Sequence, residues 1–289
     1  MQLGVLYNTD RMTGPDLVAY AQRLDRLGYE SLWLPELFGR EPLATAGWLL
    51  AATENITVGT GIVNVYARDA VATAAGATTL AEMSGGRFHL GLGVSNRPLN
   101  EMRGHDNWIA PARKTREYID AIRSTRLTLA EAEYPITVAA HGPRLIEAAA
   151  DVADGVSTYL MTTGHAARTH EVIEGRSPGT ELTVMTMVLR CEDPEEARRL
   201  ARKAAGYYIG LPHYLEAWRA DGYDESDVAD GGSDRLIDDL VTWGSTDQIR
   251  ERLAARAEAG TDRVVVIPLN AAGGRQPDWD LLEALNEPN

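Results

Sequence analysis

The stretch ITVGTGIVNVYARDAVATAAGATTLAEMSGGRFHLGLGV, residues 56–94, contains one complete unit of the fold. Residues 56–65 are rich in β-branched side chains and predict a strand, and residues 69–86 predict a helix that stops at a glycine pair. Residues 87–94 predict a second strand. A strand, a helix and a strand in succession are typical of parallel neighbours in one sheet.

Two glycines interrupt the first of these strands. Gly59 and Gly61 give up side chains in a segment that otherwise packs well as a strand, and glycine weakens a strand interior. A bulge or a tight bend in a barrel would explain them. A flat ligand lying against the backbone would explain them equally well.

The same alternation continues on both sides of this unit. Further strands are predicted at residues 3–8, 31–36, 135–140, 155–160, 181–190 and 262–269, and further helices at 14–28, 42–54, 107–126, 142–154, 164–175, about 194–218 and 246–260. Eight such units in 289 residues predict an α/β fold, a (β/α)8 TIM barrel that forms a single domain over residues 1–289. A doubly wound sheet of six or seven strands is the alternative. The polar stretch 221–235 is expected to be a surface excursion.

The composition narrows the class of partner and the compartment. The net charge of −14 argues against nucleic acid or an anionic membrane as a partner. We find no stretch long enough to cross a bilayer and no signal peptide at the start of the sequence. Cys191 is the single cysteine, so the chain cannot form an internal disulfide, and we expect a cytoplasmic protein.

In a barrel of this type, chemistry takes place at the carboxyl ends of the strands. AAHGPR, residues 139–144, carries a strand into a helix, and free N–H groups at a helix start form an anion site that Gly142 would let a phosphate approach. The next unit ends in TYLMTTGHAAR, residues 158–168, which brings Thr162, Thr163 and Gly164 to a second helix start. The pair predicts a phosphate site, although ordinary strand-to-helix turns remain the alternative.

The residues that several other kinds of catalysis require are missing from the sequence. The six histidines form no HxH or HExxH pair, and Glu36 is the only acid at the end of an early strand, so no metal site is expected. Lys114 and Lys203 both fall on predicted helices, which disfavours a Schiff-base aldolase. No GxSxG motif or P-loop is present.

Three segments carry a resemblance to a known family. Residues 56–93 resemble the signature of the bacterial luciferase-like monooxygenase superfamily, in which a GTG strand leads through a helix ending in SGGR to an LGLG strand. PITVAAHGPRLIEAAADVADGV, residues 135–156, is similar to the phosphate segment of that family. Residues 238–269 are similar to its branch of coenzyme F420-dependent oxidoreductases. The resemblance therefore implies an oxidoreductase that transfers a hydride between coenzyme F420 and a small organic substrate.

The resemblance also implies where the cofactor lies. The third strand would carry a bulge with a non-proline cis peptide at Gly61–Ile62, and the two glycines would clear space for the flat ring. The cofactor-binding residues that the resemblance implies are Gly61, Ile62, Asn64, Val94, Ser95, Ala140, His141, Gly142, Tyr159, Thr162, Thr163 and Gly164. Glu36, or His141 if it faces the ring, would be the proton donor or acceptor. Arg40, Arg68 and Arg97 would suit the acidic tail of F420, or they are solvated surface charges.

Two departures from the family pattern limit the substrate. Members that oxidise sugar phosphates carry a DH pair after the second strand and a GxGE motif after the fourth. The present sequence has Glu36-Leu37 and SNRP, residues 95–98, at these places, so sugar-phosphate dehydrogenation is disfavoured. The connection before the fifth strand is also short, which predicts an open site.

Three alternatives remain open from the sequence. The first is an FMN-dependent monooxygenase on the same fold, and the second is a non-catalytic barrel that binds flavin or F420. A phosphate-substrate lyase or isomerase without a redox cofactor is disfavoured because its lysine and metal ligands are missing. A homodimer is a further expectation, since dimers are common among similar proteins.

Overall fold

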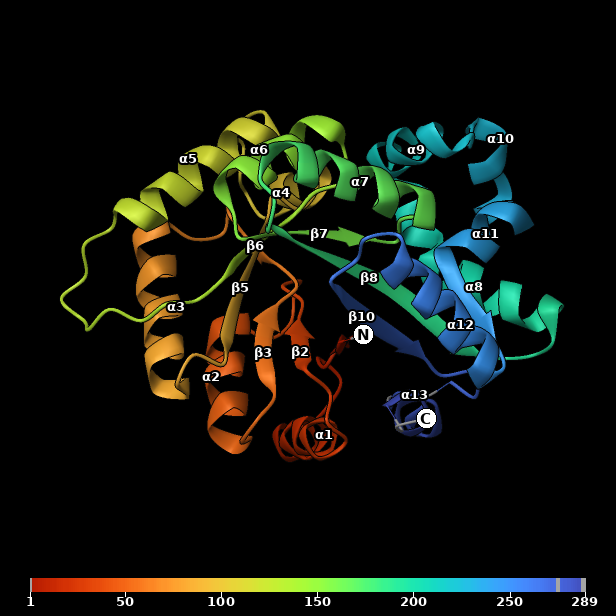
Figure 1. Cartoon of the computed structure of the whole chain (residues 1–289), viewed down its shortest axis with the longest axis horizontal. Coiled ribbons are helices and arrows are strands. Elements are labelled where there is room, and N and C mark those ends of the chain that lie inside the picture. Colours follow the sequence, from red (N-terminus) through yellow and green to blue (C-terminus); the bar gives the residue numbers. More distant parts are fainter. Residues whose placement is uncertain (1, 274–275, 287–289) are drawn as a thin grey trace.

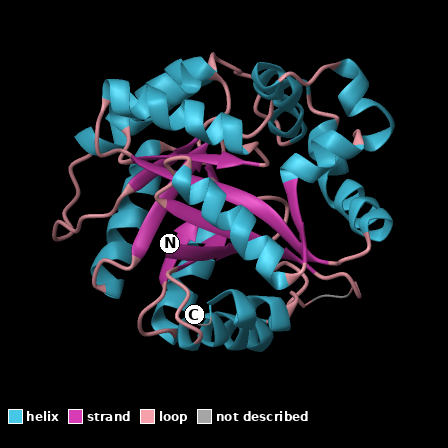
Figure 2. Ribbon diagram, turned by 45° about the vertical axis from the view of Figure 1, so that its right-hand side comes forward, coloured by secondary structure: helices cyan, strands magenta, loops and turns pink. Residues whose placement is uncertain are grey.

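The computed structural model describes residues 2–273 and 276–286 and shows a closed parallel barrel with helices around it (Figure 1, Figure 2). The barrel strands are β1 (Gln2–Leu6), β2 (Ser31–Leu34), β3 (Thr57–Thr60) with its continuation β4 (Val63–Asn64), β5 (Phe88–Gly93), β6 (Ile136–Ala139), β7 (Gly155–Tyr159), β8 (Glu181–Arg190) and β10 (Arg263–Leu269). Each pairs in parallel with the next, and β10 closes the ring by pairing with both β8 and β1. The predicted eight-stranded TIM barrel is confirmed, and the doubly wound sheet is excluded.

The helices cover the outside of the barrel. Those that were predicted are α1 (Gly14–Arg26), α2 (Pro42–Ala52), α3 (Ala70–Ser84), α5 (Pro111–Ser124), α6 (Pro143–Val152), α7 (Thr163–Arg176), α8 (Pro194–Ile209) and α12 (Thr246–Glu258). Their starts follow the usual chemistry, since Thr13, Asp69 and Ser245 cap α1, α3 and α12 with side-chain oxygens. None of the helices built from the described residues combines the length and the apolar character that a membrane span requires.

Several elements differ from the prediction. The helical region expected at about 194–218 consists of two helices, α8 and α9 (Pro212–Trp218), because Gly210 ends the first and Pro212 disfavours a helical residue before it. The stretch 221–235 is not a plain excursion. It contains α10 (Glu225–Val228), the 3-10 helix η2 (Ala229–Gly231) and the start of α11 (Asp234–Leu240).

Four short elements have no counterpart in the prediction. These are α4 (Arg97–Met102), the 3-10 helix η1 (Arg219–Asp221), the strand β9 (Val241–Gly244) and α13 (Trp279–Asn286). The strand β9 pairs with the carboxyl half of β8, beyond the point where β7 stops, and so lies outside the closed ring. Each is too short to give a clear periodic pattern in the sequence.

The third strand is interrupted at the predicted place. Strand β3 ends at Thr60, β4 begins at Val63, and the peptide bond between Gly61 and Ile62 is cis. The two pieces pair with β5 through Val58↔Phe88 and Val63↔Leu92. The expected bulge with a cis peptide at Gly61–Ile62 is confirmed.

Gly59 has a different role from the one expected. A Cβ atom on Gly59 would lie 2.8 Å from Cε3 of Trp33, and one on Gly61 would lie 2.9 Å from Cδ1 of Leu6. Trp33 is fully buried inside the barrel, where its indole also packs against the ring of His89 at 4.9 Å. The expectation that Gly59 clears space for a cofactor is wrong, because the missing side chain makes room for Trp33.

Candidate functional site at the barrel mouth

The carboxyl ends of the barrel strands gather most of the predicted site residues at one mouth. Gly61 and Ile62 are half-buried there, and the side chain of Ile62 lies over the backbone of Gly93 on the neighbouring strand. Ala140 is buried, and its N–H donates to the carbonyl of Ser157, so it can offer only backbone to a ligand. The exposed surface of Gly61 and Ile62 is therefore the place where a flat group can lie.

Glu36 follows β2 and is held in a network of cations. Its side chain is 5% exposed, and its carboxylate accepts hydrogen bonds from Nη1 of Arg68 at 3.0 Å and from Nη2 of Arg103 at 3.2 Å. The same carboxylate accepts from the backbone N–H of Asn64 at 2.8 Å. Three donors, two of them charged, hold Glu36 as an anchor for the turn after β4, and a catalytic role for it stays a prediction.

Asn64 is buried and fully engaged. Its amide donates to Oδ1 of Asn100 at 2.7 Å, and its Oδ1 accepts from the N–H of Tyr66 at 3.0 Å. The amide of Asn100 donates in turn to the carbonyl of Val94 at 2.8 Å. Sequence reasoning missed Asn100, which ties the ends of β4 and β5 together. The only signal for it was its position in the helix that begins after Asn96.

Val94 and Ser95 shape the mouth through the backbone. Val94 is buried, whereas Ser95 is half-buried and takes a left-handed conformation with φ of 55°. The next residue, Asn96, caps α4 and donates from Nδ2 to the hydroxyl of Tyr207 on α8 at 3.3 Å. This contact links the start of α4 to the end of α8.

His141 follows β6 and presents one hydrogen-bond donor. Its Nε2 accepts from the backbone N–H of Tyr159 at 3.4 Å, which leaves the ring proton on Nδ1. Burial, with smaller contributions from nearby His165 and His213, lowers the pKa of His141 to about 3. The imidazole is therefore neutral at physiological pH, so it can donate a hydrogen bond to a ligand but cannot deliver a proton as an imidazolium.

Tyr159, Tyr208 and Tyr214 form an aromatic wall around His141. Burial, then the neighbouring Tyr208, raises the pKa of Tyr159 well above its ordinary value, so its hydroxyl stays protonated. The rings of Tyr159 and Tyr208 lie 4.9 Å apart, and the rings of His141 and Tyr214 lie 4.8 Å apart. The wall therefore comes from β7, α8 and α9, and it supplies neutral donors beside an apolar surface.

The start of α6 is open. Gly142 is the N-cap of this helix and provides no capping side chain, and a Cβ atom on it would meet nothing within 4 Å. Arg144, in the first turn, is exposed, and its side chain forms no ion pair or hydrogen bond with another described residue. Open space, a helix start and a guanidinium at one place fit an anion such as a phosphate.

The start of α7 is closed. Thr162 caps the helix by accepting from the N–H of His165, and its hydroxyl donates to Oδ2 of Asp221 at 2.7 Å. A Cβ atom on Gly164 would lie 2.6 Å from Oδ1 of Asp221. The two helix starts are neighbours, since Nε2 of His165 lies 2.8 Å from the carbonyl oxygen of His141. Of the two helix starts predicted to bind phosphate, only that of α6 offers a free anion position. Thr163, at the start of α7, is exposed.

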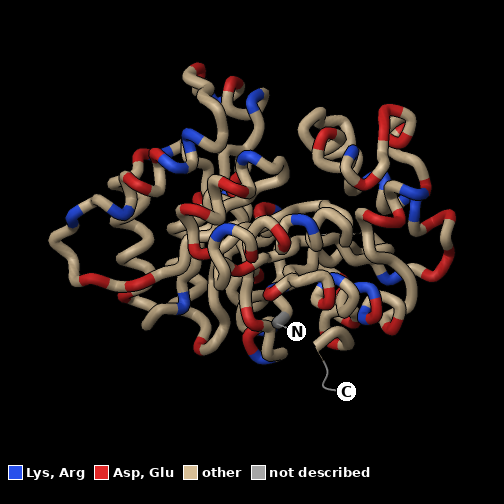
Figure 3. Tube along the Cα trace, turned by 45° about the horizontal axis from the view of Figure 1, so that its top comes forward, with Lys and Arg blue, Asp and Glu red and all other residues tan. Residues whose placement is uncertain are grey.

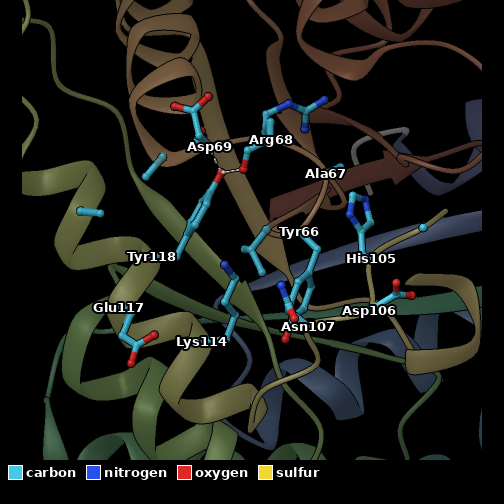
Figure 4. Close-up of a pocket in the computed structure, with 14 residues that line it drawn as sticks. Tyr66, Ala67, Arg68, Asp69, His105, Asp106, Asn107, Lys114, Glu117 and Tyr118 are labelled. Carbon is cyan, nitrogen blue, oxygen red and sulfur yellow. Dashed lines mark hydrogen bonds between the residues drawn. The ribbon is translucent and has the colours of Figure 1, made fainter. Parts of the chain in front are cut away.

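A pocket of about 700 Å³ lies beside the mouth, between the loop after β4 and the start of α5 (Figure 4). Nζ of Lys114 lies 4.9 Å from the ring centre of Tyr66 and 5.4 Å from that of Tyr118. The hydroxyl of Tyr118 donates to the carbonyls of Arg68 and Asp69, which fixes this wall. Among residues 2–273 and 276–286, no three His, Cys, Asp or Glu side chains gather as a metal site.

The three arginines considered for an acidic ligand are all engaged within the protein. Arg68 pairs with Glu36 and Glu41, and Arg97 pairs with Glu101. Arg40 donates to the carbonyl of Met12 at 2.6 Å. Figure 3 shows that basic and acidic positions lie near one another along several of the helices.

Comparisons with known proteins place the chain in a family. A Mycobacterium tuberculosis protein that bears the provisional name of a coenzyme F420-dependent oxidoreductase is 25% identical over 92% of this chain and 93% of its own length. The structure of a coenzyme F420-dependent tetrahydromethanopterin reductase from Methanopyrus kandleri superposes with a TM-score of 0.80 at 18% identity, covering 99% of this chain and 97% of that one. The FMN-bound oxygenating constituent of a Pseudomonas putida diketocamphane monooxygenase superposes with a TM-score of 0.71 at 18% identity, covering 99% and 97%. The profile of the family described as luciferase-like monooxygenase matches residues 1–263, and the chain belongs to that family.

Proposed function

We propose that this protein is an oxidoreductase that transfers a hydride between coenzyme F420 and a small organic substrate. The observation that carries the proposal is the combination, at one barrel mouth, of a half-exposed Gly61–Ile62 surface with an open helix start at Gly142. The family and the F420-dependent relative support the choice of cofactor. When bound, the deazaflavin ring of F420 supplies the carbon that gives or accepts the hydride.

The residues present fit such a cofactor at both of its ends. Gly61 and Ile62 would support the ring, and the closed network of Glu36, Asn64 and Asn100 keeps that support rigid. Gly142 would admit the phosphate, because a side chain there would take up the space that the anion needs. Rigid support matters because a hydride is transferred only at close approach and in one orientation.

In this proposal, neither His141 nor Glu36 acts as a strong acid or base. His141 is neutral, and its Nδ1–H would hold an oxygen of the cofactor or the substrate by a hydrogen bond. Glu36 acts as a positioning residue through the Asn64 turn. With neither residue serving as a strong acid or base, the site favours a substrate that exchanges a hydride without demanding a protein-borne proton.

An FMN-dependent monooxygenase is the second candidate. The FMN-bound fold neighbour and the same open helix start favour it, because both cofactors carry a flat ring and a phosphate. A non-catalytic flavin-binding barrel is the third candidate, and turnover with any acceptor would exclude it.

Binding separates these candidates. Apo-protein is titrated with F420 and, separately, with FMN, followed by fluorescence and melting temperature. We expect tight F420 binding, FMN binding at least tenfold weaker, and a loss of at least tenfold in F420 affinity for Gly142→Ala. Gly175→Ala is the matched control, because Gly175 also has open space around it but lies in the last turns of α7. Preference for FMN would move the protein to the monooxygenase reading, and binding of neither cofactor would overturn the proposal.

We also propose that the protein is a cytoplasmic homodimer. The support for a dimer is the exposure of the apolar side chains of Trp48, Val71 and Met83 on α2 and α3, two helices with a single charged residue, Glu82. The support for the compartment is a single cysteine in a chain that requires no disulfide.

A further inference from the structure

The carboxylate of Asp221, an anion that the protein itself supplies, occupies the start of α7. The carboxylate of Asp221 accepts from the hydroxyl of Thr162 at 2.7 Å and lies against the Cα of Gly164. Arg168 donates hydrogen bonds to the same carboxylate from both terminal nitrogens, from Nη1 to Oδ1 at 2.7 Å and from Nη2 to Oδ2 at 2.9 Å. A hydroxyl, a guanidinium fork and a glycine at a helix start are the groups that recognise a phosphate or a carboxylate. We call these three residues, Thr162, Gly164 and Arg168, the α7 cradle.

Asp221 fills the α7 cradle as a charged group. Its side chain is 12% exposed, and burial acts to raise its pKa. Hydrogen bonds from Arg168 and Thr162 outweigh that effect and hold the pKa of Asp221 below its ordinary value. The carboxylate is therefore ionised at neutral pH, and it neutralises the cation that an incoming anion would need.

A strap formed by α9 and η1, residues 212–221, carries Asp221 to this place (Figure 1). The indole of Trp218 donates to the carbonyl of Leu160, at the end of β7, at 3.1 Å. Tyr214 packs on the ring of His141, at the end of β6. The strap is thus fixed at three points and closes the start of α7, while it leaves Gly142 at the start of α6 uncovered.

We propose that Asp221 is a specificity-determining residue that blocks the α7 cradle and excludes phosphate-bearing substrates from this side of the mouth. A phosphate brought to the cradle would meet a fixed carboxylate at contact distance, with no cation left to offset the repulsion. One free anion position remains, at α6. The inference about substrate class rests on the proposed function, whereas the blocked cradle is a property of the protein without any cofactor.

Inorganic phosphate tests the cradle directly. We compare its affinity for wild type, Asp221→Ala and Asp221→Ala/Arg168→Ala, by calorimetry and by melting temperature, in buffers of equal ionic strength. We expect Asp221→Ala to bind phosphate at least tenfold more tightly than wild type, and the double variant to return to the wild-type affinity. Asp221→Ser is the second variant if the alanine substitution prevents folding, because its hydroxyl can still bond to Thr162.

Asp278→Ala is the matched control for loss of a carboxylate. The Arg190–Asp278 pair has the same side-chain exposures as Arg168–Asp221, 40% and 12%, and Arg190 keeps a second partner in Asp280. We expect no gain in phosphate affinity for this variant. An equal gain in Asp278→Ala, no gain in Asp221→Ala, or a gain that survives removal of Arg168 would each overturn the proposal. Because the assay contains no F420, failure of wild type to bind F420 would remove the proposed function and leave this result standing.

Discussion

The surroundings of Glu36 favour a structural role over a chemical one. As the only acid at the end of an early strand, it was the natural choice for a proton donor or acceptor. Its carboxylate instead binds two guanidinium groups and the N–H of Asn64. A buried carboxylate that loses such partners leaves their charges uncompensated, so its contribution is measurable as stability.

Replacing Glu36 tests that role. We expect Glu36→Gln to lower the free energy of unfolding by about 3 kcal/mol, because Arg68 and Arg103 lose the charge that offsets their burial. Glu101→Gln is the control, since its pair with Arg97 is half-exposed and should contribute less than about 1 kcal/mol. Urea unfolding measures both. Unchanged stability with abolished turnover would instead make Glu36 part of the chemistry.

His141 shows the limit of a prediction from residue type. A histidine at the end of a strand suggests acid–base chemistry, and the sequence offers nothing to contradict this. The structure surrounds the ring with aromatic groups and lowers its pKa to about 3, so only hydrogen bonding remains at neutral pH. The environment that decides the matter comes from α9, more than 70 residues along the chain.

At the scale of elements, the position of Trp33 restricts which side chain β3 can carry at residue 59. Gly59 faces into the barrel, where Trp33 fills the space that a side chain would need. Gly59 therefore serves the packing of the barrel below the mouth, while the surface for a ligand lies further along the strand, at Gly61 and Ile62.

Gly59→Ala tests this packing. A Cβ atom 2.8 Å from the indole of Trp33 overpacks the core, so we expect a loss of about 1–3 kcal/mol in the free energy of unfolding. Gly175→Ala, in α7, has open space and should be neutral or stabilising by up to about 1 kcal/mol. Chemical denaturation compares the two variants. Wild-type stability in Gly59→Ala would show that the barrel can shift to admit the methyl group.

Elements with strong local patterns were predictable, and those set by distant contacts were not. The strand 181–190 has the bounds predicted for it, because its apolar run is long and flanked by polar residues. The break between α8 and α9 was missed although Gly210 and Pro212 mark it. Within 221–235, Tyr223 and Asp227 are buried by packing and hydrogen bonds that local sequence does not reveal.

At the scale of the whole molecule, the site was only partly predictable. The barrel topology brings the ends of β2, β4, β5, β6 and β7 to one mouth, so residues at strand ends could be selected from the sequence alone. Asp221 could not be selected, because it reaches Thr162 across 59 positions from a polar stretch without a motif. That the chain forms a single domain over residues 1–289 stays a prediction.

The net charge of −14 makes association of two copies unfavourable except through an uncharged surface. Helix α2 has no charged residue, and α3 has only Glu82. On these helices Trp48, Val71 and Met83 keep 45%, 57% and 77% of their surface exposed. Such apolar exposure on adjacent helices is typical of a protein interface, and a two-fold axis would bring the same face of both copies together.

Trp48→Glu tests the proposed dimer, since a carboxylate within a shared apolar interface would lose its water on association without gaining a partner. We expect wild type to sediment with about twice the 31.5 kDa mass of one chain, and Trp48→Glu to sediment as a monomer with an unchanged circular dichroism spectrum. Met102→Glu is the control, because Met102 is also an exposed apolar residue but lies on α4, and it should leave the mass unaltered. A monomeric wild type at tens of micromolar would remove the dimer. A dimer that survives in Trp48→Glu would place the interface on another face.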